Sequence, residues 1–323
     1  MQACHKRKCP ALVLKLDFRK AFDSVSWESL YRILQAKGFS ETWIRWIMML
    51  NDSGQSAILI NGVPGNWIQC KNGLRQGDPI SPYLFIIIAD ILQRMILEAS
   101  AQGLLQHPIV PNSPCPVLQY ADDTLIIIKA DEDNLASLKS ILLNFSLATG
   151  LHINFAKSTF APIHVDPSVA ARMASMLGCS VATFPQNYLG LPLSTHKLRL
   201  IDFHPLIAKV DKRLAGWRGH LLSAAGRAVL VNSVIRALPP YAMSVMLLPV
   251  GSIQEIDKRC RAFFWAGDDH VNGGQCKVAW ADVCAPTKKG GLGFRCLHTR
   301  NICLLLKSLC KIHQPGLGSW DSW

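Results

Sequence analysis

Two adjacent aspartates, Asp122 and Asp123, interrupt the apolar and β-branched stretch "LQYADDTLIII", from Leu118 to Ile128. This composition predicts two buried strands joined by a turn. A buried carboxylate is costly unless it is paired, hydrogen-bonded or bound to a metal ion. Asp is also common in turns, so a solvated hairpin turn explains the dipeptide taken alone.

A second acidic position favours a metal site. The segment "ALVLKLDF", residues 11–18, predicts a buried strand that ends at Asp17. If this strand neighbours "VLQY" and "TLIII", three carboxylates meet at one edge of a sheet. Carboxylate oxygens suit a hard cation such as Mg²⁺. Two such ions, about 3.5–4 Å apart, support in-line phosphoryl transfer.

The rest of the chain predicts helices, with few further strands. Ser26 and Ser40 are placed to cap two helices within residues 26–50, and "NGVPGN" predicts a hairpin. Further helices are predicted over residues 80–99, 133–149, 203–217, 223–237 and 253–265, and a strand over 150–163. Pattern and charge both change near residue 186, so we predict an α+β fold with a domain boundary there.

The charge is concentrated in the second half of the chain. Residues 1–186 carry 16 Lys and Arg against 14 Asp and Glu, whereas residues 187–323 carry 18 against 8. Half of the residues are hydrophobic and 17% are charged, which indicates a folded globular protein. The basic half favours a polyanionic partner such as nucleic acid. A merely soluble basic domain is the alternative.

The eleven cysteines form no CxxC pair. Cys296, Cys303 and Cys310 recur every seven residues, which predicts one buried helix face and not a zinc site. An odd cysteine count without a signal peptide indicates a reducing intracellular compartment. No apolar run reaches the ~18–20 residues of a membrane span, so we expect no membrane insertion.

Four motifs resemble those of one enzyme family. "YADD", residues 120–123, resembles the catalytic box of reverse transcriptases, and "KLDFRKAFDSVSW", residues 15–27, resembles the motif with their other metal-binding aspartate. "NGLRQGDPISPYLF", residues 72–85, and "TGLHINFAKS", residues 149–158, resemble two further boxes. With "YLGLPL" and "WRGHLLSAAGRAVLVNSVI", the chain from about residue 12 resembles reverse transcriptases of non-LTR, LINE-type retrotransposons, most closely those of plants. Four boxes in family order are a strong signal.

The resemblance implies a fold and an activity. Residues 1–186 would form the palm of a right-hand polymerase, with an antiparallel sheet packed on helices, and residues 187–323 a basic helical thumb or connection. The implied activity is that of an RNA-directed DNA polymerase, which adds dNTPs to a DNA 3′-hydroxyl on an RNA template. It would use two Mg²⁺ ions, for which Mn²⁺ can substitute, and would act in the nucleus or cytoplasm.

The resemblance also assigns catalytic residues. Asp17 and Asp122 resemble the two metal-bridging carboxylates, and Asp123 resembles a third, more peripheral acid. Phe22 resembles the steric gate that excludes a ribose 2′-hydroxyl; a core phenylalanine is the alternative. Lys157 occupies the position of the lysine proposed to protonate pyrophosphate. A phosphate-neutralising or ordinary surface lysine is the alternative there.

Further positions concern nucleotide binding. Gln76 and Gly77 resemble the pair that lines the nucleotide pocket, where Gly allows close backbone approach and Gln can hydrogen-bond the nucleotide. Arg75 is expected either to meet phosphate or to be an ordinary surface residue. Asp23 is expected to cap the helix that follows it.

The basic half supplies candidate contacts to nucleic acid. Six cations with Trp217 between them would hold an RNA–DNA duplex through its phosphates: Lys209, Lys212, Arg213, Arg218, Arg227 and Arg236. The alternative is a solvated basic face with Trp217 in the core.

The match also departs from the family. Asp17 stands almost at the start of the chain, so we expect the preceding fingers and endonuclease to be missing, and the downstream Cys/His-rich segment to be absent or cut off. We therefore expect a fragment of a polyprotein, or a domesticated or decaying copy. We expect weak or no polymerase activity from the chain alone, because much of the positioning apparatus is gone. A catalytically dead nucleic-acid-binding remnant and an unstable pseudogene product are the alternatives.

Overall fold

The computed structural model describes residues 1–111, 113–215 and 219–313. The chain divides into two compact units, Met1–His196 and Lys197–Trp323, and each is treated by itself. The first unit contains a sheet with helices, whereas the described part of the second is helical. This α+β composition confirms the expected fold class.

The division between the units falls after His196 and not near residue 186. The hairpin of β10 (Gln186–Tyr188) and β11 (Leu191–Leu193) is tied to the first unit. The Lys15 Nζ donates to the carbonyl oxygen of Asn187 at 2.9 Å, and the Tyr188 hydroxyl donates to that of Leu118 at 3.3 Å. The change in charge near residue 186 therefore did not coincide with the change in packing.

The first unit is organised by a five-stranded sheet with strand order β6-β7-β1-β8-β9. Its strands are β1 (Ala11–Leu16), β6 (Val117–Tyr120), β7 (Asp123–Lys129), β8 (Thr159–Ile163) and β9 (Ser180–Val181). Strand β1 pairs antiparallel with both β7 and β8, and β9 adds to β8 in parallel. Strand β1 is central and is almost entirely apolar, as a strand covered on both faces requires.

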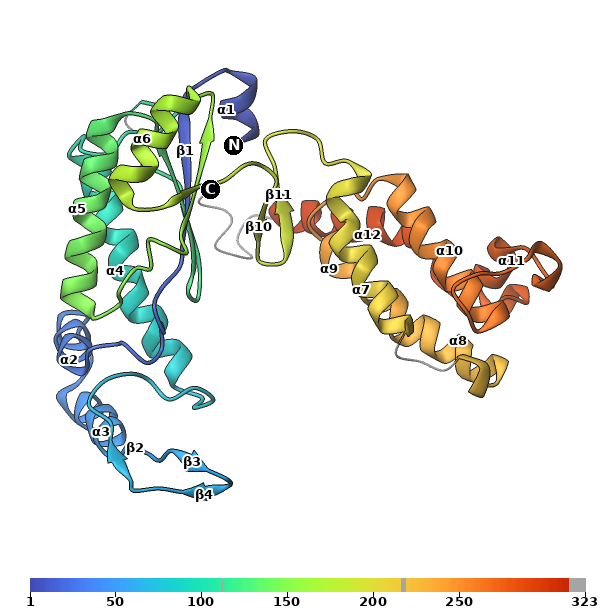
Figure 1. Ribbon diagram of the computed structural model, residues 1–323, viewed down its shortest axis with the longest axis horizontal. Helices are drawn as coiled ribbons and strands as arrows, with labels where there is room; N and C mark the ends of the chain where they lie inside the picture. The colour runs from blue at the N-terminus through green and yellow to red at the C-terminus, as the bar shows by residue number, and fades with distance from the viewer. Residues whose placement is uncertain (112, 216–218, 314–323) are drawn as a thin grey trace. The chain divides into compact units, whose positions relative to one another are not determined.

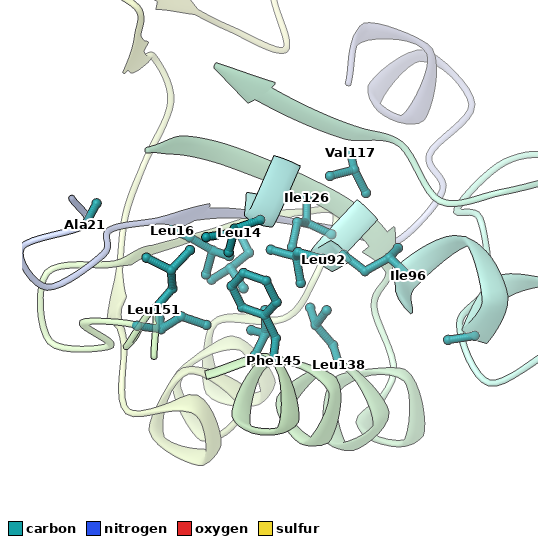
Figure 2. Packing of buried hydrophobic residues seen from close by; sticks show 14 of the residues in the cluster. Leu14, Leu16, Ala21, Leu92, Ile96, Val117, Ile126, Leu138, Phe145 and Leu151 are labelled. Atoms are coloured by element: carbon teal, nitrogen blue, oxygen red, sulfur yellow. The ribbon is translucent and has the colours of Figure 1, made fainter. Parts of the chain in front are cut away.

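Helices cover one face of this sheet. They are α4 (Ser81–Ala101), α5 (Glu132–Thr149) and α6 (Pro167–Leu177), while α2 (Trp27–Ala36) packs on α4 and α5, and α3 (Glu41–Asp52) packs on α2 (Figure 1). Figure 2 shows Phe145 and Leu138 of α5 beside Leu14 of β1 and Ile126 of β7, within the main hydrophobic core. Alternate residues such as Val13 face a smaller core on the other side, which also contains Cys4 of α1 (Gln2–Lys6).

The helix ends follow their capping residues. The Ser26 and Ser40 hydroxyls accept hydrogen bonds from the backbone N–H groups of Ser29 and Trp43, which confirms both predicted caps. Gly150 ends α5 in the left-handed conformation that its sequence position favours. The prediction that Asp23 caps α2 is wrong, because Ser26 is the N-cap.

A ribbon extends between α3 and α4 (Figure 1). It consists of the paired strands β2 (Gln55–Ser56) and β5 (Ile68–Gln69), followed outward by β3 (Leu59–Ile60) and β4 (Val63–Pro64). All four strands are exposed. The "NGVPGN" turn therefore forms the predicted hairpin, on an arm that no other described element covers.

The described part of the second unit is built on four main helices, α7 (His204–Ala215), α8 (Ala224–Ser233), α10 (Val250–Ala266) and α12 (Leu297–Ile312). Shorter elements complete it: η1 (Leu200–Phe203), η2 (Gly219–Leu221), η3 (Ile235–Ala237), α9 (Pro240–Met243), η4 (Gly273–Gln275), α11 (Trp280–Cys284) and η5 (Thr287–Lys289). Among the residues described in either unit, none forms a helix long and apolar enough to cross a membrane.

Helix α12 corrects one prediction. Cys303 and Cys310 do lie in a helix that begins just after Cys296, but all three cysteines are exposed. The buried side of α12 contains Leu297 and Asn301 instead. The Asn301 side-chain amide bonds the backbone at three points in the segment 243–248, so a polar residue anchors this helix.

Candidate active site

The sheet register brings the predicted acids to one end of the sheet. Leu16, the last residue of β1, pairs with Thr124, and Tyr120 pairs with Asp123 across the β6–β7 turn. Asp17 therefore leaves β1 beside the turn that contains Asp122. Ala121 turns the chain with a positive φ of 52°. Two segments separated by about a hundred residues thus present their carboxylates at the same edge.

The backbone around Asp17 is fixed, whereas its carboxylate is free. The Asp17 N–H donates to the Ser158 hydroxyl at 3.1 Å, and its carbonyl accepts from the N–H of Asn154 at 2.7 Å. Within the described ranges, the carboxylates of Asp17 and Asp122 have no hydrogen-bond or ion-pair partner. Carboxylates held in position without a protein partner are suited to bind a cation.

Lys15 is a cation at this edge that was not predicted. It belongs to the central strand β1 and lies on the same face as Asp123, two strand positions before Asp17. Its Nζ is 3.8 Å from a carboxylate oxygen of Asp123 and donates to Asn187 in β10. Lys15 therefore links β1, the Asp-Asp turn and the β10–β11 hairpin.

The acids fit a hard divalent cation in kind but are not gathered into a cage. In the part of the chain that the structure describes, no three His, Cys, Asp or Glu side chains are close enough together to hold a metal ion. The donors at the edge are oxygen atoms only, which matches the preference of Mg²⁺. Asp17 and Asp122 are the free donors, and Asp123 is shared with Lys15.

Lys157 lies in the loop that fixes Asp17. The Asn154 and Ser158 contacts to Asp17 belong to this loop, and Phe18 forms a β-bridge with Ile153. The Lys157 side chain is exposed and has no described partner. Because this loop contacts the backbone of Asp17, the position of Lys157 is compatible both with protonation of pyrophosphate and with neutralisation of a phosphate.

Phe22 packs toward the core. Its ring stacks on that of Phe85 in α4, with centroids 4.7 Å apart and an angle of 15° between the planes. Its backbone carbonyl accepts a hydrogen bond from the N–H of Leu74 at 2.7 Å. Phe22 is half-buried, and one face of its ring packs on Phe85. Its role as a steric gate against a ribose 2′-hydroxyl stays a prediction.

The loop with Arg75, Gln76 and Gly77 borders an open cavity of about 530 Å³. The Arg75 guanidinium donates to the Leu50 carbonyl at 3.0 Å and the Ser53 hydroxyl at 2.9 Å, so it fastens the loop to the end of α3. The sequence predicted that Arg75 either contacts phosphate or is an ordinary surface residue. Its hydrogen bonds to α3 correspond to neither role. The Gln76 side-chain amide approaches the Asp23 carboxylate at 3.5 Å.

Gly77 adopts a φ of +93°, which favours glycine over any residue with a Cβ. A Cβ at this position would contact nothing within 4 Å. The sequence predicted glycine here for close approach of a nucleotide. In the protein itself, backbone conformation is sufficient to require it.

The predicted duplex contacts in the second unit divide into two groups. Lys209, Lys212 and Arg213 are exposed on one face of α7, opposite buried Val210 and Leu214. This arrangement is available to a phosphate backbone. Trp217 and Arg218 lie outside the described residues.

Two arginines of the predicted set have structural partners. The Arg227 guanidinium donates to the Trp265 carbonyl at 3.2 Å, which ties α8 to the end of α10. Arg236 is 1% exposed and donates to a carboxylate oxygen of Asp257 at 2.7 Å. The prediction that Arg236 holds a duplex is therefore wrong, since its charge is enclosed by the second unit.

Comparison with known proteins gives the family. Residues 1–193 match the family model described as "Reverse transcriptase (RNA-dependent DNA polymerase)", which covers more than half of the chain. The chain belongs to the reverse transcriptase family. The matched range contains both strands that carry the acids, the loop with Lys157 and the β10–β11 hairpin.

Retrotransposon proteins are among the relatives of this chain. A Pol polyprotein from the type-1 retrotransposable element R2 of Popillia japonica is 32% identical over 317 residues, covering 94% of this chain and 49% of the relative. The transposon TX1 uncharacterized 149 kDa protein of Xenopus laevis is 25% identical, covering 89% and 21%. A putative ribonuclease H protein of Arabidopsis thaliana is 32% identical over 130 residues, covering 40% and 21%. The chain thus spans about half or less of these relatives.

Among solved structures, telomerase from Candida tropicalis in complex with a fragment of telomeric RNA is similar to this chain. The identity is 12% and the TM-score 0.46, with 99% of this chain and 50% of the telomerase chain covered.

Lys15 and Asn51 are the residues near the site that sequence reasoning missed. Lys15 could have been found, because a lysine inside "ALVLKL" poses the same question as the aspartates inside "LQYADDTLIII". Asn51 carried no comparable signal. Its side-chain nitrogen is buried without a hydrogen-bond partner and borders the cavity beside Arg75, a property that only packing creates.

Proposed function

We propose that this chain is the reverse transcriptase module of a non-LTR retrotransposon of plants, and that it extends a DNA primer on an RNA template with dNTPs. The observation that carries the proposal is the sheet edge where Asp17 and Asp122 lie together with carboxylates that no described residue pairs, the Asp17 backbone being held by Ser158 and Asn154. The retrotransposon polyproteins among the relatives support the element type, and the Arabidopsis relative supports the plant affiliation. We propose the nucleus or cytoplasm as the place of its action, as the family resemblance implies.

The residues of the chain have distinct tasks in this proposal. Asp17, Asp122 and Asp123 would hold two Mg²⁺ ions, and the chemistry these ions would supply is activation of the primer 3′-hydroxyl and stabilisation of the charge on the pyrophosphate leaving group. Ser158 and Asn154 hold the backbone of Asp17 in place. Lys157 would neutralise or protonate pyrophosphate.

Substrate selection is assigned to neighbouring residues. Phe22 limits room at the sugar, and Gln76 and Gly77 border the nucleotide. The exposed face of α7 binds the phosphates of the RNA–DNA duplex through Lys209, Lys212 and Arg213. Arg75 and Arg227 have an indirect role in this proposal. Arg75 fixes the loop that contains Gln76 and Gly77, and Arg227 fixes α8 to the end of α10.

Primer extension on an RNA template with Mg²⁺ tests the proposal. We expect slow extension by the wild-type chain and none by Asp122→Asn, because an amide is a poor ligand for the metal ions. Asp166→Asn is the matched control, since Asp166 caps α6 through its side chain and Asn preserves a cap. Salt-sensitive duplex binding without synthesis in a folded wild-type chain would overturn the catalytic proposal and select a nucleic-acid-binding protein.

A further inference from the structure

Regular sheet pairing is interrupted just after β1. On the β8 side, pairing runs as far as Lys15, which faces Thr159. The next contact of this kind is the bridge between Phe18 and Ile153. Uninterrupted pairing would place Phe18 opposite Ala156, three residues beyond Ile153, so three additional residues are inserted on the β8 side. They form a bulge, and a bulge leaves the facing strand without its regular ladder bonds.

Asp17 is the residue that faces this interruption, and Ser158 compensates for it. The Asp17 N–H donates to the Ser158 hydroxyl at 3.1 Å, and this hydroxyl donates to the Asn154 carbonyl at 2.9 Å. The Asn154 N–H in turn donates to the Asp17 carbonyl at 2.7 Å. A side-chain hydroxyl therefore takes the place of the backbone acceptor that the bulge removes from the ladder.

The Ser158 hydroxyl acts on Asp17 more than on the bulge itself. Ser158 is fully buried, and its hydroxyl both donates and accepts within the protein. The backbone N–H groups of Lys157 and Ser158 also donate to the Asn154 carbonyl, at 3.1 and 2.9 Å, so the turn is closed without the hydroxyl. Its removal would leave the Asp17 N–H as the group that loses its acceptor.

The direction of the Asp17 carboxylate depends on this backbone. A group that orients a metal ligand without touching the metal commonly changes metal affinity by tenfold or more when it is removed. The same bulge contains Lys157, so the bond between Asp17 and Ser158 also fixes the spacing between the backbones of Asp17 and Lys157.

We propose that Ser158 is a positioning residue for the metal-binding carboxylate of Asp17, and that this position requires a hydroxyl group. The hydroxyl holds Asp17 in line with β1 where regular pairing fails. The inference deepens the proposed function and rests on it for the presence of metal ions at Asp17. Ser158 itself contacts neither the metal ions nor the substrates.

Ser100 provides a matched control. Its hydroxyl accepts from the N–H of Cys115 at 3.3 Å and donates to the carbonyl of Ile96 at 2.9 Å. Like Ser158, it joins an N–H distant in the sequence to the carbonyl four residues earlier. Cys115 precedes β6 whereas Asp122 follows it, so the control lies at the other end of this strand. Ser100→Ala therefore removes an equivalent pair of bonds away from the acids.

Mn²⁺ titration of the full chain by electron paramagnetic resonance, without nucleic acid, tests the proposal. Ser158→Ala should weaken Mn²⁺ binding about tenfold. Ser158→Thr keeps the hydroxyl and should bind Mn²⁺ like the wild type, as should Ser100→Ala. Wild-type Mn²⁺ affinity in folded Ser158→Ala would overturn the proposal, and so would an equal loss in Ser100→Ala. If Ser158→Ala fails to fold, Ser158→Cys serves in its place, because it fills the site with a much weaker acceptor.

Hydrogen exchange of the Asp17 amide measures the proposed bond without metal. In the metal-free chain, this amide should be protected in the wild type and in Ser158→Thr, and should exchange at least tenfold faster in Ser158→Ala. Unprotected exchange in the wild type would contradict the bond. Mn²⁺ binding that depends on Ser158 without primer extension would refute only the proposed function. Extension by Ser158→Ala at the wild-type rate and with wild-type Mn²⁺ affinity would refute only this inference.

Discussion

The ammonium nitrogen of Lys15 lies 3.8 Å from a carboxylate oxygen of Asp123, with the two side chains 32% and 40% exposed. A cation thus stands beside the acidic edge where divalent cations are proposed to bind. The same nitrogen donates to Asn187 at 2.9 Å, so Lys15 also joins the sheet to the β10–β11 hairpin. Removing the Lys15 charge should therefore have two separable effects, one on cation binding near Asp123 and one on the stability of the first unit.

Lys15→Met should destabilise the first unit by about 1 kcal/mol, because a partly exposed ion pair and one hydrogen bond are lost. It should also strengthen Mn²⁺ binding at the carboxylates, since a neighbouring positive charge is removed. Thermal melting and Mn²⁺ titration by electron paramagnetic resonance measure the two effects. Lys139→Met is the control: Lys139 donates to the Met176 carbonyl, so melting should change and Mn²⁺ binding should not. Unchanged Mn²⁺ affinity in Lys15→Met would contradict an electrostatic role.

Two asparagines predict opposite effects on stability. Asn51→Leu should stabilise the free protein by about 1 kcal/mol, because an unpaired buried nitrogen is replaced by an apolar group. Asn134→Leu should destabilise it by about 1–3 kcal/mol, because the Asn134 side chain bonds Asp131 at 2.5 Å and the Gln106 N–H at 2.6 Å. Denaturant unfolding measures both. A loss of stability in Asn51→Leu would show that this side chain has a partner in solution.

The sequence predicted the elements of the first unit well because their signals are local. The apolar run of β1, the serine caps and the Gly150 stop each depend on neighbours within a few residues. The joint position of Asp17 and Asp122 followed from one further assumption, that their strands pair, and the register confirms it.

The failures required knowledge of packing. Residues 302–306 of α12 are apolar on all sides, so periodicity could not tell that Asn301 faces inward and Cys303 outward. Arg236 has the composition of a phosphate contact, yet Asp257 and Phe294 enclose it. Arg75 and Asn51 acquire their roles only where α3 meets the loop that follows the ribbon.

The exposed face of α7 should dominate electrostatic binding in the second unit. A triple Gln variant at Lys209, Lys212 and Arg213 should weaken binding to an RNA–DNA duplex and reduce the salt dependence by about one counterion per contact removed. Fluorescence anisotropy over a series of salt concentrations measures both. Because these side chains are exposed, the thermal melting curve should barely change.

Arg236→Met is the comparison for that experiment. It should destabilise the second unit by about 3–5 kcal/mol, because Asp257 and the Arg295 carbonyl lose a buried partner. At a temperature where the variant is still folded, its duplex affinity should equal that of the wild type. If folded Arg236→Met bound the duplex more weakly than the wild type, Arg236 would contact the duplex despite its burial.

The carboxylate of Asp90 links α4 to the end of α2. Lys37 Nζ lies 2.6 Å and Arg94 Nε 2.7 Å from the same oxygen. Partial burial raises the pKa of Asp90, but the hydrogen bonds and charges of Lys37 and Arg94 outweigh it and hold the pKa below its ordinary value. The stabilisation is therefore complete above the unfolded pKa of about 3.9 and is lost as pH falls through the lower folded pKa.

Asp90→Asn should consequently be less stable than the wild type by about 1 kcal/mol at neutral pH, and the difference should vanish in acid. Urea unfolding between neutral and acidic pH measures this convergence. Glu98→Gln is the control, because among the described residues the Glu98 carboxylate is paired only with the neutral Gln102 side chain, at 2.7 Å. A difference for Asp90→Asn that persists at the lowest pH would show that its origin is not the ion pairs.

The cysteines of the second unit should react in a defined order. Cys296 is exposed at the start of α12, and the backbone N–H of Thr299 is the main cause of the lowered pKa of its thiol. Burial raises the pKa of Cys260 to about 12 and that of Cys284 to about 11. Since the thiolate is the nucleophile, iodoacetamide should label Cys296 first and Cys260 last.

Mass spectrometry of timed, quenched samples gives the order of labelling. Thr299→Val is a control for the side-chain contribution to the Cys296 pKa alone, since the variant keeps the backbone N–H donor. Early labelling of Cys260 in the native chain would mean that α10 opens readily, contrary to its buried position.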